Sequence, residues 1–208
     1  RVIEESFVQA GIRYRMYGGL KFYDRKEVKD ILAYLRVMIN PADDISVRRI
    51  INVPKRAIGD TTVAELAKHA AQEEMPLLTA CMDMPESISS RARKNVEKFS
   101  ELMMNLTMMA ETMKLTDLVQ YVIDTVGLES QYAKEDSDEA RSRVENIREF
   151  VGAVKEFEEK ADNPTLTEYL ENVSLVSDLD EMSEDGGAVT MMTLHSAKGL
   201  EFPNVFMV

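Results

Sequence analysis

The chain has 208 residues, with 25 Lys and Arg against 37 Asp and Glu, and 45% of its residues are apolar. This length suffices for one domain or two small ones with a hydrophobic core, and the composition excludes collagen-like and low-complexity proteins. No apolar run approaches the roughly 18 residues that a membrane span requires, so no membrane association is expected. The single cysteine, Cys81, excludes an internal disulfide and a Cys-based zinc cluster, and it is typical of a cytoplasmic protein. Because the chain does not begin with Met and ends on an apolar run, we expect it to be a piece of a longer protein.

The charge is unevenly distributed along the chain. Residues 1–60 hold 12 Lys and Arg against 8 Asp and Glu, whereas residues 61–208 hold 13 against 29. The net charge of −12 argues against a nucleic-acid partner, but the amino-terminal part alone is basic enough to face an anion. An ordinary solvated surface would have the same composition, so both interpretations stay open.

The predicted elements are mainly helical. A helix over 2–10 ends at Gly11, and the alternation in 12–17 predicts a strand. Helices are then expected over 24–40, 43–51, from 60 onward, and over 76–82, 88–113, 117–126, 137–161 and 165–176. An acidic linker over 178–187 precedes a buried strand at 188–194, a turn at 195–199 and another strand at 204–208. The fold class is therefore mainly α, a helical domain inserted between short α/β segments at both ends.

Five methionines fall within the predicted helix at 88–113, and we expect them to fill the core as flexible apolar side chains; a Met-lined binding groove is the alternative. They are Met103, Met104, Met108, Met109 and Met113.

Several catalytic motifs are absent. The chain has no G-x-x-x-x-G-K-[ST] phosphate loop, no H-E-x-x-H and no G-x-S-x-G. Its only histidines are His69 and His195, so no metal site is expected.

A polar loop follows the predicted strand at 188–194. Thr193 and Ser196 are able to hydrogen-bond phosphate oxygens there, and Lys198 is able to neutralise one. An ordinary turn at the end of a strand uses similar residues, so this loop has a structural alternative.

As a string, residues 193–202 (T-L-H-S-A-K-G-L-E-F) closely resemble motif V of the superfamily 1 DNA helicases of the UvrD/PcrA/Rep type. Residues 17–36 resemble the segment by which these helicases enter their inserted accessory domain, called 2B. Residues 50–59 resemble their P-x-R-G-I-G hairpin, and residues 143–147 (R-V-E-N-I) resemble a further family signature. The four segments occur in the family's order.

The resemblance implies three parts and an activity. Residues 1–20 would begin the second RecA-like motor domain, residues 21–187 would form the helical accessory domain, and residues 188–208 would return to the motor. The full-length protein would be an ATP-dependent helicase that uses ATP and Mg²⁺ to move 3′→5′ on DNA. This piece alone, lacking the phosphate loop, is predicted to be inactive and to bind no cofactor.

The resemblance also implies site residues. Arg1 would be the catalytic arginine that reaches the γ-phosphate of ATP, unless it is a terminal arginine without a role. Glu201 would approach the nucleotide sugar. The single-strand contacts would come from Thr193, His195, Ser196 and Lys198.

Apart from the resemblance, the hairpin has local features that suit phosphate binding. A turn from Lys55 to Gly59 followed by a helix start presents unpaired backbone N–H groups and the positive end of a helix dipole. Such an arrangement binds DNA phosphates independently of the base sequence, and we expect it to bind the phosphates of the duplex. The expected DNA-binding residues are Lys55, Arg56, Ile58, Gly59, Thr61 and Thr62. Ala57 stands where the family has glycine, and its methyl group is expected to oppose a positive φ and close phosphate approach. A purely structural turn is the alternative.

Two functions remain open from the sequence. The first is a helicase segment that binds single-stranded DNA, the duplex junction and the remaining helicase domains, with repair or replication proteins as further partners. The second is a helical protein-interaction or autoinhibitory module of a helicase or helicase–nuclease, which the acidic remainder of the chain favours.

Overall fold

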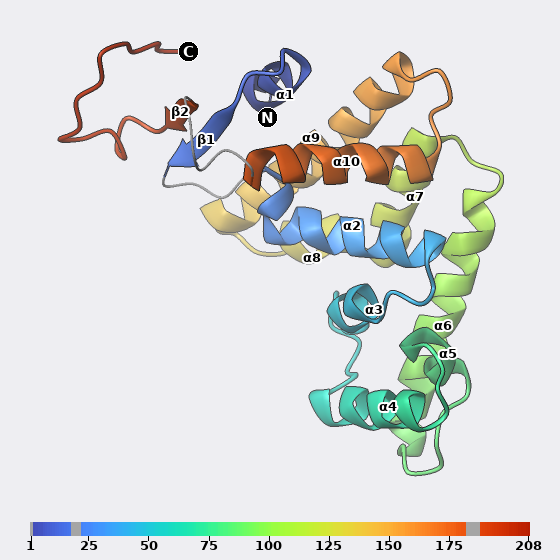
Figure 1. Cartoon of the computed structure of the whole chain (residues 1–208). Coiled ribbons are helices and arrows are strands. Elements are labelled where there is room, and N and C mark those ends of the chain that lie inside the picture. Colours follow the sequence, from blue (N-terminus) through green and yellow to red (C-terminus); the bar gives the residue numbers. More distant parts are fainter. Residues whose placement is uncertain (1, 18–21, 182–187) are drawn as a thin grey trace. The chain divides into compact units, whose positions relative to one another are not determined.

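The computed structural model describes residues 2–17, 22–181 and 188–208, and it is mainly helical, as predicted. The chain forms two compact units (Figure 1). Unit 1 comprises Arg1–Arg25 and Glu171–Val208, and unit 2 comprises Lys26–Leu170.

Unit 1 brings together segments from the two ends of the sequence. Helix α1, Val2–Gln9, is followed by Gly11 at φ +63°, and then by strand β1, Tyr14–Tyr17. Strand β2, Val189–Met192, pairs with β1 in parallel, with Tyr14 opposite Val189. The predicted strands near the two ends therefore form one two-stranded sheet, although about 175 residues separate them. A short 3₁₀ helix, η1, covers Phe22–Asp24.

Three expectations for the carboxyl-terminal part were wrong. Residues 188–194 were expected to be a buried strand, but β2 spans four residues and Val189 is exposed. Residues 204–208 form no strand and are exposed, because no strand of the described residues pairs with them. Helix α10, Leu166–Glu181, continues through the first residues of the expected acidic linker, and 182–187 lie outside the described residues.

Unit 2 is built around helix α2, Lys26–Ile39, which contacts α3, α6, α7 and α9. Ten of its 14 residues are buried, including the charged Glu27 and Asp30, because other helices cover it on several sides, and this makes α2 the centre of the core. The covering helices are α3 (Asp44–Ile50), α6 (Ser90–Ala110), α7 (Leu115–Val126) and α9 (Asp138–Lys160). Between them lie α4 (Asp60–Gln72), α5 (Leu77–Met82) and α8 (Leu128–Ala133).

Local sequence explains most of the helix ends. Asp43 caps α3 by accepting a hydrogen bond from the backbone N–H of Ser46 at 3.0 Å. Gly127 ends α7 in the left-handed region at φ +80°. Helix α8 was not predicted, because Leu128 and Tyr132 supply only one turn of apolar spacing.

The methionines of α6 are divided between core and surface. Met103 is buried, as expected. Met104 and Met108 are 59% and 61% exposed, so the expectation that they fill the core was wrong. They lie one turn apart, on the side of the helix opposite the core residue Phe99.

Candidate nucleic-acid interface

The hairpin between α3 and α4 is held in shape by the side chain of Asn52. Its Oδ1 accepts hydrogen bonds from the backbone N–H of Arg56 at 2.7 Å and of Ile58 at 3.3 Å. The Ile58 side chain is buried in the core of unit 2, so this residue can meet DNA only through its backbone. Asn52 and Ile58 together anchor the two ends of the turn.

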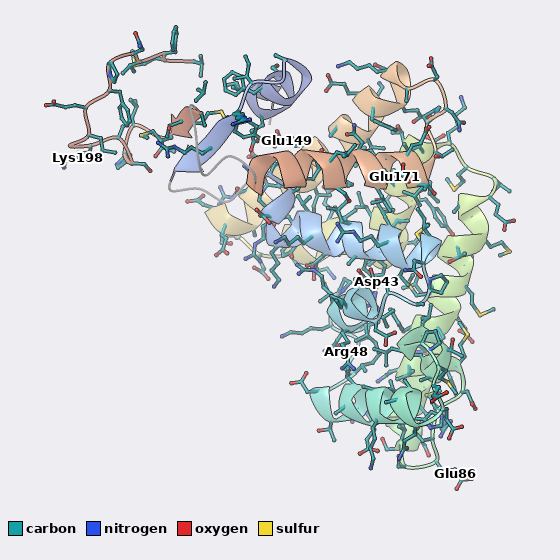
Figure 2. All side chains as sticks on the ribbon, viewed as in Figure 1. Asp43, Arg48, Glu86, Glu149, Glu171 and Lys198 are labelled. Atoms are coloured by element: carbon teal, nitrogen blue, oxygen red, sulfur yellow. The ribbon has the colours of Figure 1, made fainter. Side chains whose placement is uncertain are left out.

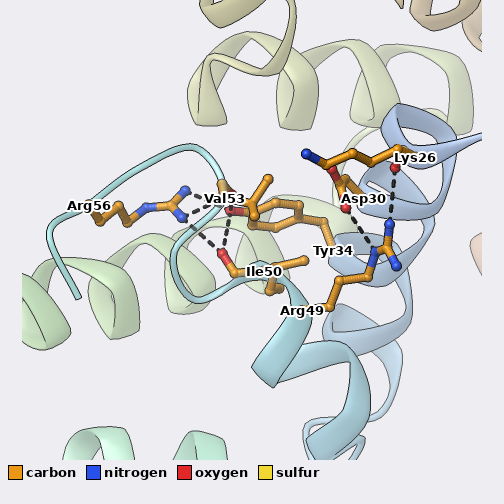
Figure 3. Close-up of polar contacts among 7 residues, drawn as sticks. All are labelled: Lys26, Asp30, Tyr34, Arg49, Ile50, Val53 and Arg56. Atoms are coloured by element: carbon orange, nitrogen blue, oxygen red, sulfur yellow. Dashed lines mark hydrogen bonds and ion pairs between the residues drawn. The ribbon is translucent and has the colours of Figure 1, made fainter. Parts of the chain in front are cut away.

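The guanidinium of Arg56 points into the protein (Figure 3). Its Nη1 donates to the carbonyl oxygens of Ile50 and Val53, both at 3.0 Å, and its Nη2 donates to the hydroxyl of Tyr34 at 2.6 Å. The guanidinium also lies 5.5 Å from the centre of the Phe99 ring. A cation at the last carbonyls of α3 complements the negative end of that helix. The structure therefore gives Arg56 internal partners, where the sequence led us to expect a phosphate contact.

Tyr34 completes this network from α2. Its hydroxyl donates to the carbonyl oxygen of Val53 at 2.5 Å and accepts from Arg56. Burial raises the pKa of Tyr34 to about 12, although the neighbouring Arg56 favours the phenolate. The phenol stays neutral across the physiological range and serves as both donor and acceptor.

A second contact joins α3 to α2 beside this network (Figure 3). Arg49 Nε lies 2.8 Å from Oδ1 of Asp30, and Arg49 Nη2 donates to the carbonyl oxygen of Lys26 at 3.1 Å. Burial raises the pKa of the Asp30 carboxyl and outweighs the opposing effect of Arg49. The two contacts fix the helix that leads into the hairpin.

Ala57 adopts φ +56°, in the left-handed region that favours glycine. The turn therefore adopts the positive φ that the methyl group was expected to oppose, with the steric cost that a Cβ carries there. The surrounding contacts hold it: Asn52 binds the backbone on both sides, and Asn95 Nδ2 of α6 donates to the carbonyl oxygen of Ala57 at 3.4 Å. Ala57 itself is exposed.

The start of α4 presents backbone donors. Gly59 is the N-cap, at φ −80° and ψ 164°, and no side chain caps the helix. The first backbone bond runs from the N–H of Val63 to the carbonyl of Gly59 at 3.1 Å. The N–H groups of residues 60–62 therefore have no partner in the described part of the chain. A Cβ built on Gly59 would meet no atom within 4 Å, so a ligand can approach the backbone of Gly59 from that side.

The side chains around this helix start differ in accessibility. Lys55 and Thr61 are exposed, and Thr62 is half-buried. Asp60 is also exposed and adds a negative charge in the first turn. Of the expected residues, Lys55, Gly59 and Thr61 are exposed and Thr62 is half-buried, so these four are the accessible ones besides the backbone of Ile58.

The loop after β2 in unit 1 is a series of tight turns. Thr193 Oγ1 accepts from the backbone N–H of Ser196 at 3.2 Å and lies 3.0 Å from its hydroxyl. The N–H of Leu200 bonds the carbonyl of Ala197 at 3.0 Å, and Gly199 takes φ +83°. The structure thus brings Thr193 and Ser196 together at the carboxyl end of a strand, where ligands bind in open α/β sheets.

The remaining expected residues of unit 1 are solvent-facing. His195, Lys198 and Glu201 are exposed, with Lys198 on the loop labelled in Figure 2. Arg1 lies outside the described residues. This loop belongs to unit 1 and the hairpin to unit 2.

Three residues that shape the hairpin carried no expected role in the sequence: Tyr34, Asn52 and Asn95. Asn52 lies inside the hairpin string, and a turn-forming asparagine there is a recognisable signal. Tyr34 and Asn95 lie 22 and 38 residues from their hairpin partners, and no local pattern indicates such contacts.

No helix among the described residues is long and apolar enough to cross a lipid bilayer. No group of three or more His, Cys, Asp or Glu residues there is placed to hold a metal ion.

The whole chain, residues 1–208, matches the family described as the UvrD-like helicase C-terminal domain, and the chain belongs to that family. It is 43% identical over 215 residues to the ATP-dependent DNA helicase PcrA of Bacillus subtilis (strain 168). It is 42% identical over 211 residues to the PcrA of Staphylococcus epidermidis (strain ATCC 12228 / FDA PCI 1200), and 41% over 211 residues to that of Staphylococcus aureus (strain NCTC 8325 / PS 47). Each match covers 100% of this chain and 29% of the relative, so the chain spans less than a third of these proteins.

Proposed function

We propose that this chain is part of an ATP-dependent DNA helicase that moves 3′→5′, acts in the cytoplasm and cooperates with repair or replication proteins. In this proposal residues 21–187 are the inserted accessory domain, and residues 1–20 and 188–208 belong to the second motor domain. The similarity to PcrA helicases over the whole chain supports it. The parallel pairing of β1 with β2 agrees with it, because an insertion between two strands of one sheet leaves them paired.

The hairpin and the start of α4 are the proposed duplex grip. The observation that carries this assignment is the set of unpartnered N–H groups at residues 60–62, next to the open face of Gly59 and the exposed ammonium of Lys55. Such a helix start binds a phosphate through backbone donors and the helix dipole, independently of base sequence. Arg56 would act indirectly, by bracing the hairpin through Tyr34 and the end of α3.

The loop after β2 is the proposed single-strand and nucleotide contact of the motor. Thr193, His195, Ser196 and Lys198 would bind the strand backbone, and Glu201 would approach the nucleotide sugar. All but Ser196 are exposed. Arg1 would reach the γ-phosphate.

ATP and Mg²⁺ would be bound mainly outside this chain, because it contains no phosphate loop. The residues present do not make a complete nucleotide site. We expect purified residues 1–208 to show no ATPase activity. Turnover that is abolished by a substitution at Glu201 would contradict this.

Fluorescence anisotropy with a 3′-tailed duplex tests the duplex grip. Gly59→Ala should weaken binding several-fold, because the added methyl group points into open space where a phosphate would approach. Lys55→Gln should weaken it and reduce the slope of log affinity against log salt by about 0.9. Lys134→Gln is the control, since Lys134 is equally exposed but lies at the end of α8. Equal binding by all four proteins would overturn the grip.

A second candidate function has one observation in its favour. Met104 and Met108 form an exposed, flexible apolar pair on α6, and such methionines suit adaptable protein-binding surfaces. Under this alternative, unit 2 is a protein-interaction or autoinhibitory module. Substituting both methionines by Gln would then abolish partner capture or raise the activity of the full-length protein, and leave DNA affinity unchanged.

A further inference from the structure

We propose that the first three turns of α6 form a second phosphate-binding surface for duplex DNA, beside the hairpin. The surface is a basic stripe made of Arg91, Lys94 and Lys98. The inference rests on the proposed duplex grip and extends it, because it adds cations from a part of the sequence more than 30 residues away from the hairpin.

Two contacts place this part of α6 against the hairpin. Asn95 Nδ2 donates to the carbonyl oxygen of Ala57 at 3.4 Å, and the Arg56 guanidinium lies 5.5 Å from the centre of the Phe99 ring. Both α6 residues lie within the first ten positions of the helix. The hairpin therefore runs along the amino-terminal half of α6.

The helical geometry puts the basic stripe on the hairpin's side of α6. At about 100° per residue, Arg91, Lys94 and Lys98 fall within an arc of about 60°, and Asn95 borders that arc. Val96 and Phe99 point into the core, and all three stripe residues are exposed. The stripe therefore continues the accessible surface that begins at the hairpin.

The acidic side chains of this helix lie outside the arc of the basic stripe. Glu97 and Glu101 fall beyond Lys94, on the side away from Asn95. Residues 89–98 hold four Lys and Arg and one Glu, so this short segment is basic within the acidic remainder of the chain. Counting charges separately over residues 1–60 and 61–208 does not reveal this basic segment. The fold, and not the order of the sequence, brings residues 91–98 next to the basic hairpin.

Two observations indicate that these cations are there for a ligand. Among the described residues, no acidic side chain forms an ion pair with Arg91, Lys94 or Lys98. Arg91 and Lys94 also lie near the positive end of the α6 dipole, where the first turn has no acidic residue and cations are unfavourable. Cations at the positive end of a helix dipole are locally unfavourable, and here no acidic partner in the described part of the chain offsets them. Such an unfavourable arrangement is expected at a functional site.

The stripe matches the spacing of a phosphate backbone. Lys98 lies seven positions after Arg91 on the helix, a rise of about 10 Å. Consecutive phosphates of one DNA strand rise about 3.4 Å, so three cations over this length face about three phosphates. Together with the backbone donors at residues 60–62, they would hold a longer stretch of duplex than the hairpin alone.

The test compares two double variants of residues 1–208 in anisotropy titrations with a blunt 20-base-pair duplex at 50 and 200 mM salt. Lys94→Gln/Lys98→Gln removes two charges from the stripe, and Lys134→Gln/Lys155→Gln removes two exposed charges from α8 and α9. The stripe variant should lower the slope of log affinity against log salt by about 1.8. The factor by which the affinity falls between 50 and 200 mM salt should therefore be about twelve times smaller than for wild type. The control pair should bind as wild type, and circular dichroism should show both variants folded.

Other outcomes separate this inference from the proposed function. If Lys55→Gln weakens duplex binding while the stripe variant binds as wild type, the stripe is refuted and the hairpin grip stands. If wild type binds no duplex even at 50 mM salt, both are refuted. If the stripe variant loses affinity for a poly-glutamate peptide but not for the duplex, the surface fits an acidic protein and the DNA assignment is wrong.

Discussion

The guanidinium of Arg56 donates a hydrogen bond of 2.6 Å to the hydroxyl of Tyr34, across 22 residues of sequence. The contact joins a residue of the candidate DNA-binding hairpin to the central helix of unit 2. It gives the Arg56 guanidinium partners inside the protein, whereas the neighbouring Lys55 is exposed to solvent.

We expect Arg56→Ala to lower the free energy of unfolding by about 3 kcal/mol. The substitution leaves the hydroxyl of Tyr34 and the carbonyls of Ile50 and Val53 without their donor. Urea unfolding followed by circular dichroism measures the change. Lys55→Ala is the matched control and should stay within about 0.5 kcal/mol of wild type.

The loss of unfolding free energy caused by Tyr34→Phe should not add to the loss caused by Arg56→Ala, because both substitutions break the same network. A double variant whose destabilisation equals the sum of the two single losses would show that the Arg56–Tyr34 contact contributes nothing to stability.

Ala57→Gly should stabilise the chain by about 0.5–1 kcal/mol. Alanine at φ +56° carries a steric cost of about 1–2 kcal/mol, which glycine removes while adding some entropy to the unfolded chain. The same urea unfolding measures it. Glu74→Gly is a second test of this reasoning, since Glu74 has φ +50°. Destabilisation by both substitutions would contradict the assigned backbone conformations.

Asp43→Ala should cost about 1 kcal/mol at pH 7, because α3 loses its cap. Burial opposes ionisation of Asp43, but hydrogen bonds from the hydroxyl and backbone N–H of Ser46 outweigh it and hold the pKa of the carboxyl below its usual 3.8. The charge-dependent part of its stabilisation is therefore complete above pH 3.8 and lost as the pH falls through the lowered folded-state pKa.

The measurement is the difference in unfolding free energy between wild type and Asp43→Asn, taken from pH 7 to pH 3. Asparagine keeps the cap but cannot ionise, so the difference should shrink as the pH falls below about 4. A difference that grows toward low pH would contradict the lowered pKa.

Cys81 should resist alkylation in the folded chain. Its side chain is fully buried, and burial, reinforced by the charge of Asp44, raises the pKa of its thiol from 9.0 to about 12. That change lowers the thiolate population roughly a thousandfold at pH 8. Iodoacetamide labelling followed by mass spectrometry should be slow in buffer and fast in urea. Equal rates in both would show that Cys81 is accessible in the folded state.

The sequence by itself determined the helical class and most helix positions of this protein. Apolar spacing, Asp43 as a cap and Gly127 as a stop are local signals, and they act within one or two turns of chain. The strings at 50–59 and 193–202 likewise pointed to the family and to both candidate sites.

Only the tertiary structure decided which side chains of those sites are accessible. Arg56 turns inward because Tyr34 and the end of α3 offer it partners, and Ala57 takes a positive φ because Asn52 and Asn95 hold the backbone around it. The strand predicted at 204–208 has no partner among the described residues and stays irregular. These outcomes depend on contacts between residues far apart in the chain, and local propensity carries no information about such contacts.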